Sequence, residues 1–243
     1  MDENSKAGRY LCEKDANYER LEATRLAFLE YVNARYASCV YFEGKIKDKK
    51  QAREAMRISL DAWETPDDIE RFVALRPPFF KKADYDLAGQ WQNYLHGPLY
   101  CMEAHGQTAL FMCESRVFEV VSFGRSWNDM VPVTPDLVLA TLLPFGEIIV
   151  SDGLLMHHCS KAVGPGVLRI QQEFEKGKSH GIVRDAHEFV RRTQEINDLH
   201  ERIGWDPTSY YTWHQYIDEI NNKTYDTCFP YEIVAKMRSW DAA

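Results

Sequence analysis

Long hydrophobic runs are missing from this chain of 243 residues, since no stretch approaches the roughly eighteen consecutive apolar residues that a transmembrane helix requires. The segment Met1-Asp2-Glu3-Asn4-Ser5-Lys6 is polar and acidic and has no apolar run, so we expect no secretory leader and a cytoplasmic protein without membrane contact. Basic residues are fewer than acidic ones: the chain has 29 Lys and Arg and 37 Asp and Glu, which gives a net charge of −8. Binding a phosphate backbone needs a basic surface, and general nucleic-acid binding is therefore not expected.

Cysteine pairs with metal-binding or redox spacing are also absent. The six cysteines, at positions 12, 39, 101, 113, 159 and 228, include no C-x-x-C pair, and the chain is far longer than the small disulfide scaffolds. We therefore expect reduced thiols, no bound metal and no cofactor. Hydrophobic residues make up 45% and charged residues 27%, which excludes disordered, collagen-like and coiled-coil proteins and indicates an ordinary globular fold.

Charge is sparse in the middle of the chain. Residues 97–164 hold three basic and seven acidic residues and are rich in Val, Leu, Phe and Ile, so this segment should be the most buried. Short apolar runs separated by turn residues lie at 98–102, 109–113, 117–121, 137–143, 147–150 and 153–156. Five or six such strands indicate a small antiparallel, barrel-like sheet at about residues 97–160, whose closure would hide its apolar edges.

Helical periodicity marks residues 1–96. A first helix of about twenty residues, with Asp15 as a candidate N-cap, should bury Leu21, Phe28, Leu29, Val32 and Tyr36. A second should begin at Asp48 and bury Ala52, Met56 and Trp63.

A third, short helix is indicated by Thr65-Pro66-Asp67-Asp68. Thr65 would cap it, Pro66 suits the first turn, and the acidic residues favour the positive end of the helix dipole. Arg76-Pro77-Pro78 should end it, because the residue before a proline is pushed out of the α region. Phe79-Phe80-Lys81-Lys82 follows as a basic and aromatic patch.

Residues 161–243 return to helical patterns. One helix should open at Gly164-Pro165-Gly166, and another should be capped by Asp185. Their inward residues are expected to be Val167, Ile170 and Phe174 in the one and Phe189, Ile196, Leu199 and Ile203 in the other. A further helix should cover residues 210–222. The sequence thus predicts an α+β protein in which N-terminal and C-terminal helices flank the barrel, with no linker that separates independent domains.

His157, His158 and Cys159 form the most concentrated group of reactive side chains. On an extended segment His157 and Cys159 point to one face, so both could contact one ion or one substrate. Further metal ligands would have to come from the first hairpin, where the spacing of His96, Cys101, His105 and Cys113 matches no established zinc pattern. Alternatively Cys159 is a nucleophile, with a distant base such as His180 or His187 and an acid such as Asp152 or Glu147. A third interpretation treats these cysteines as small buried apolar residues.

A glycine-rich turn leads into the first C-terminal helix. Free amides at the helix start, near Gly164 and Gly166, favour anions, and Arg169 could add a charge-assisted contact. No phosphate-loop or dinucleotide signature accompanies them, so a simple tight connection that needs glycine is the favoured explanation of the turn.

Aromatic residues crowd the last forty positions. Trp205, Tyr211, Trp213 and Trp240 are candidates for a partner surface, because Trp and Tyr dominate interface hot spots. The alternative is that they are buried and close the core.

The segment 142–155 reads Leu-Leu-Pro-Phe-Gly-Glu-Ile-Ile-Val-Ser-Asp-Gly-Leu-Leu and is followed by the glycine-rich turn and Val167-Leu168-Arg169. This segment resembles a module of uncharacterised bacterial proteins, some of which also carry a SEC-C zinc motif. The chain departs from the SEC-C type, because no C-x-C followed by a His-Cys pair occurs near its C-terminus. The resemblance implies a bacterial cytoplasmic protein and assigns no catalytic residue.

Two functional hypotheses follow. The first is a non-enzymatic binding or adaptor protein that recognises a protein or polyanionic partner through the barrel surface and the aromatic C-terminal region. The second is a hydrolase-type or metal-dependent enzyme with a site at His157, His158 and Cys159 and an anion cradle at residues 164–166.

Overall fold

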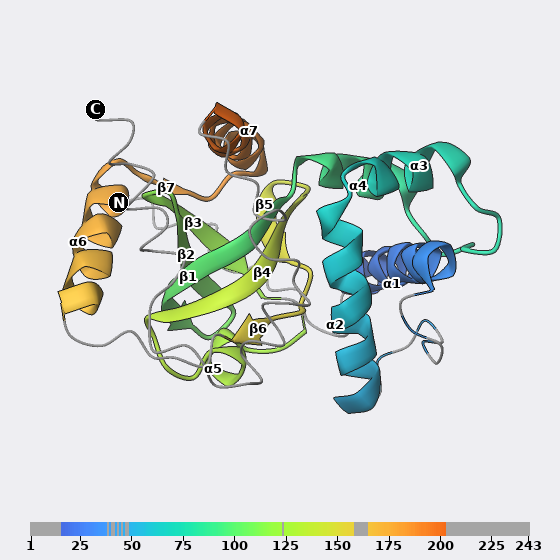
Figure 1. Ribbon diagram of the computed structural model, residues 1–243, viewed down its shortest axis with the longest axis horizontal. Helices are drawn as coiled ribbons and strands as arrows, with labels where there is room; N and C mark the ends of the chain where they lie inside the picture. The colour runs from blue at the N-terminus through green and yellow to red at the C-terminus, as the bar shows by residue number, and fades with distance from the viewer. Residues whose placement is uncertain are drawn as a thin grey trace.

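A computed structural model describes residues 16–37, 39, 42, 44, 46, 49–122, 124–157 and 165–202 (Figure 1). The first part is helical: α1 (Ala16–Tyr36), α2 (Lys49–Glu64), α3 (Asp67–Leu75), α4 (Tyr85–Gln90) and the 3-10 turn η1 (Trp91–Asn93). The barrel region holds β1 (Leu95–His105), β2 (Thr108–Cys113), β3 (Arg116–Val121), α5 (Trp127–Met130), β4 (Asp136–Phe145), β5 (Ile148–Ser151) and β6 (Met156–His157). Then come α6 (Pro165–Ser179), β7 (Ile182–Val183) and α7 (Ala186–Arg202). Among the helices of this described part, none has the length and apolar character needed to cross a membrane.

Five strands close into a barrel, which confirms the predicted α+β class with a barrel-like sheet flanked by helices. The strand order is β1-β2-β3-β5-β4, and β4 pairs with β1 to complete the ring. The neighbours are antiparallel except β3 and β5, which run parallel where Val121 faces Val150. This order, with α5 between β3 and β4, is the topology of the OB-fold, a five-stranded Greek-key barrel. Strand β6 extends the sheet beside β4, and β7 lies parallel to β3.

Alternation along the strands sorts side chains between the barrel interior and its outer faces. On β2, Ala109 and Phe111 point inward, whereas Leu110 and Met112 point outward. Trp127 of α5 fills one end of the barrel, where it packs edge-on against Phe111 at 5.0 Å between ring centroids and donates its Nε1–H to the Val120 carbonyl. Helix α7 lies over the other end (Figure 1), and its buried Phe189 packs against Phe118.

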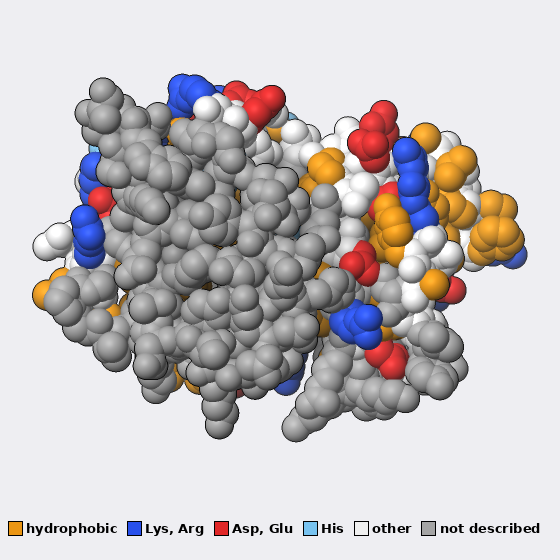
Figure 2. Space-filling view, in the orientation of Figure 1, with side chains coloured by type: hydrophobic (Ala, Val, Ile, Leu, Met, Phe, Trp, Pro, Cys, Tyr) orange, Lys and Arg blue, Asp and Glu red, His pale blue; other side chains and the backbone are white. Residues whose placement is uncertain are grey.

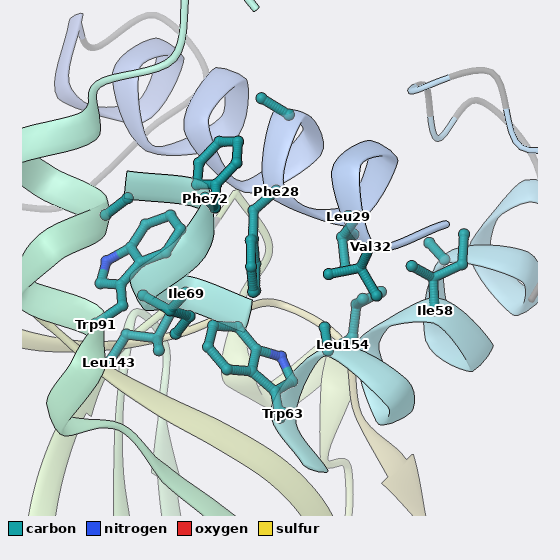
Figure 3. Close-up of a cluster of buried hydrophobic side chains, with 14 of the residues drawn as sticks. Phe28, Leu29, Val32, Ile58, Trp63, Ile69, Phe72, Trp91, Leu143 and Leu154 are labelled. Carbon is teal, nitrogen blue, oxygen red and sulfur yellow. The ribbon is translucent and has the colours of Figure 1, made fainter. Parts of the chain in front are cut away.

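The N-terminal helices cover the outer face of β4 and β5. A single cluster of buried side chains from α1 to η1 includes Leu143, Phe145 and Val150 of these strands and Leu154 after them. Figure 3 shows side chains of α1, α2, α3 and the sheet pointing into this cluster. The helices and the barrel therefore share one core.

A buried carboxylate, Asp152, reinforces this junction. Its Oδ2 accepts hydrogen bonds from Ser59 Oγ at 2.8 Å and Trp63 Nε1 at 3.0 Å, both on α2, and its Oδ1 accepts from the Leu154 amide at 3.0 Å. Burial raises the pKa of Asp152, while the Leu154 amide, Arg25 and the two α2 donors act in the opposite direction. Three donors on one carboxylate fix α2 to the turn after β5.

Helix α6 covers the outer face of β1, β2 and β3. Ile170 and Phe174 pack on the outward side chains Met102, Leu110, Met112 and Val117. The helix lies close because Gly177 has no side chain: a Cβ there would come within 2.7 Å of the Ser115 carbonyl oxygen and 2.8 Å of Val117 Cγ2. OB barrels bind oligonucleotides and oligosaccharides on the face that includes strands 2 and 3. In this protein α6 occupies that face.

Several local predictions are wrong. Tyr36 is 42% exposed, because it is the last residue of α1 and lies beneath the Arg35 guanidinium rather than in the core. The fully buried positions of α2 include Ala55, Ile58 and Ala62, whereas Ala52 and Met56 lie at the edge of the buried face and are partly exposed.

The start of α3 and the end of the sheet also differ from expectation. Thr65 does not cap α3, because the N-cap is Pro66 and the Thr65 carbonyl instead accepts from the Asp68 amide. The strand expected at 153–156 is only Met156–His157, since Gly153 has a φ of +77° and the Asp152 side chain bonds the Leu154 amide in a turn. Asp15 and Asp48, proposed as helix starts, lie outside the described residues.

Candidate functional site

Of the predicted reactive group His157, His158 and Cys159, the structure describes His157. It lies on β6, which pairs with β4 so that His157 faces Val138. Its Nδ1 is 2.8 Å from Oδ2 of Asp136, the first residue of β4. This hydrogen bond raises the pKa of His157, and partial burial acts against it. The acids proposed from sequence were Asp152 and Glu147, but Asp152 is engaged by α2, and the acid that contacts His157 is Asp136.

A carboxylate on one ring nitrogen orients a histidine and stabilises its protonated form, which is how many catalytic histidines are held. The imidazole of His157 is about half exposed, and the backbone of Met130 adds a second hydrogen bond that also raises its pKa. Both contacts stabilise the protonated ring and anchor it to two segments. His158 and Cys159 lie outside the described residues, so the structure does not place a nucleophile or a second ligand beside it.

The first hairpin does not supply the further ligands considered from sequence. Desolvation lowers the pKa of His96 to about 3, and its Nδ1 lies 2.8 Å from Thr141 Oγ1. Cys101 is buried within the barrel, where burial raises its thiol pKa to about 12. His105 is exposed and bonds Glu103. Across the described ranges, no group of three or more His, Cys, Asp and Glu side chains is placed to hold a metal.

The predicted anion cradle lies only partly within the described residues. The helix expected at this turn is confirmed as α6, which begins at Pro165, and Arg169 is exposed in its second turn. Gly166 belongs to α6, and Gly164 lies outside the described residues. The partner-surface candidates Trp205, Tyr211, Trp213 and Trp240 also lie outside them.

One G-x-S-x-G match in the chain, Gly177-Lys178-Ser179-His180-Gly181, lies at the wrong kind of junction for a serine nucleophile. Such a nucleophile occupies a sharp turn from a strand into a helix. Ser179 is instead the last residue of α6, and its Oγ donates to the Lys176 carbonyl at 2.7 Å. Gly181 then adopts a φ of +104° in the turn toward β7. The pattern is therefore the end of a helix.

Solvent-exposed apolar side chains point to a different surface. Among the described residues, Phe79 is the most exposed large hydrophobic side chain at 84%, and Leu75 at the end of α3 is 66% exposed. Phe79 belongs to the segment 76–84 between α3 and α4, which we call the α3–α4 loop. Sequence reasoning noted the basic and aromatic character of this segment but could not tell which of its two phenylalanines is outside.

Local contacts hold the α3–α4 loop in shape. The Phe80 ring packs against Phe72 of the core with 6.0 Å between ring centroids, and the Phe80 amide donates to the Pro77 carbonyl at 3.2 Å. The Tyr85 hydroxyl donates to the same Pro77 carbonyl at 2.8 Å. With Phe80 and Tyr85 as anchors, the neighbouring Phe79 is directed into solvent.

Basic residues flank Phe79 in the sequence of the loop. The Arg76 guanidinium forms an ion pair with Asp86 at 3.0 Å and lies over the Tyr85 ring. Lys81 and Lys82 are both exposed, and neither has an ion-pair partner among the described residues. Figure 2 shows hydrophobic and basic side chains together at the end of the molecule where Figure 1 places this loop. The surface can offer one aromatic ring and two exposed lysines to a partner.

Comparison with known proteins gives no relative: no protein-family model, no curated protein and no solved structure matches the chain.

Proposed function

We propose that the protein is a non-enzymatic binding or adaptor protein that contacts a protein partner through the α3–α4 loop. The observation that carries this proposal is the 84% exposure of Phe79 on a loop that Phe80 and Tyr85 anchor to the core. Contiguous exposed apolar patches rimmed by polar residues mark interaction sites, and aromatic residues dominate binding energy at interfaces.

The covering of the barrel supports placing the partner surface on this loop. Helix α6 occupies the outer face of β1–β3, and α1, α2 and η1 occupy that of β4–β5. Trp127 and Phe189 fill the two ends. The barrel surface considered from sequence is thus largely internal, whereas Phe79 and Leu75 already face solvent.

Affinity capture from a lysate of the source cell, quantified by mass spectrometry, tests this proposal with a matched pair of variants. Phe79→Ser removes the exposed ring, and Leu168→Ser changes an apolar residue on α6 that is 63% exposed. We expect at least one protein to be captured by the wild type and by Leu168→Ser and to be lost with Phe79→Ser. If every captured protein is retained by Phe79→Ser, the α3–α4 loop is not the docking element.

A second candidate function, a hydrolase that uses Cys159, is favoured by the Asp136–His157 hydrogen bond alone. If His157 activates the Cys159 thiol, iodoacetamide should label Cys159 faster than Cys12 at neutral pH, and His157→Gln should remove the difference. Equal labelling of the two cysteines would refute this candidate and leave His157 with a structural role.

A further inference from the structure

We propose that the partner segment bound by the α3–α4 loop is acidic and apolar, so that carboxylates pair with Lys81 and Lys82 while apolar side chains enclose Phe79. This inference rests on the proposed function and adds the chemistry of the partner.

Charge complementarity favours an acidic partner. Residues 76–82 contain three basic residues and no acidic one, in a chain whose net charge is −8. Arg76 is engaged by Asp86, which leaves Lys81 and Lys82 as the cations available to a partner. Their exposed position suits contacts that steer association and depend on salt.

Apolar contact must accompany the charges, because Phe79 and Leu75 expose more of their surface than the other large hydrophobic residues described. Two prolines and the Pro77 carbonyl bonds already fix the loop, so little conformational entropy is lost when a partner encloses Phe79. A single-stranded nucleic acid would need several stacking rings along a basic groove, whereas this loop exposes one ring on an acidic protein.

Two labelled peptides of equal length and equal charge separate the contributions. One consists of repeated Glu-Glu-Leu units and the other of repeated Glu-Glu-Ser units, and both are titrated with the full-length protein by fluorescence anisotropy. We expect the wild type to bind the leucine peptide at least about tenfold more tightly than the serine peptide. Phe79→Ser should abolish this preference, the double variant Lys81→Ser/Lys82→Ser should weaken binding of both peptides, and Leu168→Ser should match the wild type.

Three results would overturn the proposal. The first is equal affinity for the two peptides, which would mean that charge alone is recognised. The second is no binding of either peptide while affinity capture still finds a partner that depends on Phe79; in that case the docking loop is correct and its partner chemistry is not. The third is co-sedimentation with phosphatidylserine–phosphatidylcholine vesicles that Phe79→Ser abolishes, which would identify a lipid surface instead. Circular dichroism and thermal unfolding identical to the wild type confirm that each variant is folded.

Discussion

The barrel is covered on two faces by helices that are attached in different ways. The cluster on the N-terminal side contains twenty buried hydrophobic residues, four of which come from β4, β5 and the turn that follows, whereas the cluster between α6 and β1–β3 contains six, two of which are methionines. Burial of apolar area is the main source of stability, so the larger cluster should contribute more to the free energy of unfolding than the smaller one. The N-terminal helices are therefore part of the main hydrophobic core, whereas α6 is a cover on the outside of the barrel.

Polar contacts show the same contrast. On the N-terminal side, Asp152 is 2% exposed and receives hydrogen bonds from Ser59 and Trp63. On the α6 side, Lys178 pairs with Glu103 at 3.2 Å, and both side chains are about one-third exposed. Exposed ion pairs contribute little, commonly less than about 1 kcal/mol. We therefore expect α6 to open locally at a lower free energy than the N-terminal helices.

The largest effect should follow from removing a ring at the centre of the N-terminal junction. Trp63 packs against Phe28, Trp91 and Tyr94, so Trp63→Ala should lower the free energy of unfolding by about 3–5 kcal/mol. Urea denaturation measures this, with Leu168→Ala as a surface control expected to stay within about 0.5 kcal/mol of the wild type. A loss below about 1 kcal/mol for Trp63→Ala would contradict a shared core.

A smaller decrease in the free energy of global unfolding is expected when Asp152 is replaced. Asp152→Ala leaves the Ser59 hydroxyl, the Trp63 indole N–H and the Leu154 amide without their acceptor, at a cost of about 2–4 kcal/mol. Ser59→Ala removes one donor and should cost about 1 kcal/mol. The two variants and their combination form a double-mutant cycle by urea denaturation; strict additivity would show that the Ser59 bond contributes nothing.

A local effect is expected at α6. Gly177→Ala places a Cβ against the Ser115 carbonyl and Val117, so α6 should move off the sheet at a cost of about 1–3 kcal/mol, despite the better helix propensity of alanine. Gly89→Ala on α4 is the matched control, since the nearest atom to its Cβ would be 4.0 Å away, and it should be neutral or stabilising. Hydrogen exchange should increase in residues 165–179 alone for Gly177→Ala. Faster exchange across α1 and α2 as well would show that both covers open together.

The smallest effect is a pH dependence at the β4–β6 pair. Because Asp136 raises the pKa of His157, the protonated ring stabilises the fold below the unfolded value of about 6.5, and this contribution is lost as the pH rises through the folded-state pKa. His157→Gln should therefore destabilise the protein more at about pH 5 than at about pH 8, by less than about 1 kcal/mol because the pair is partly exposed. Thermal unfolding at both pH values tests this, and Asp136→Asn should remove the same dependence. A destabilisation that grows with pH would reverse the sign and refute the ion pair.

The features that could be predicted from sequence are those encoded by local patterns. The short apolar run 109–113 between turn residues identifies a strand, and Asp185 before α7 identifies a helix start; the structure confirms the helix start, with Asp185 Oδ1 accepting from the His187 and Glu188 amides. The short helices α4 and α5 and the two-residue strand β7 were not predicted, because elements of this length carry too little periodicity.

The candidate sites were harder to predict because they depend on contacts between distant residues. Asp136 and His157 are 21 residues apart and meet only through the pairing of β4 with β6. Phe79 and Phe80 are identical neighbours, so their composition cannot show that one packs on Phe72 while the other faces solvent. The different environments of Phe79 and Phe80 are decided by the way α3 packs against α4, which sequence composition does not show.

The shared core also sets an order of events during protein synthesis. Helices α1, α2 and α3 leave the ribosome well before β4 and β5, yet their common core is completed by Leu143, Phe145, Val150 and Leu154. Domains tend to fold as they emerge, but the core of this helical segment is incomplete until the chain has been synthesised up to residue 154. A chain that ends before residue 154 therefore leaves apolar side chains of α1, α2 and α3 exposed, which makes it a target for chaperones and proteases.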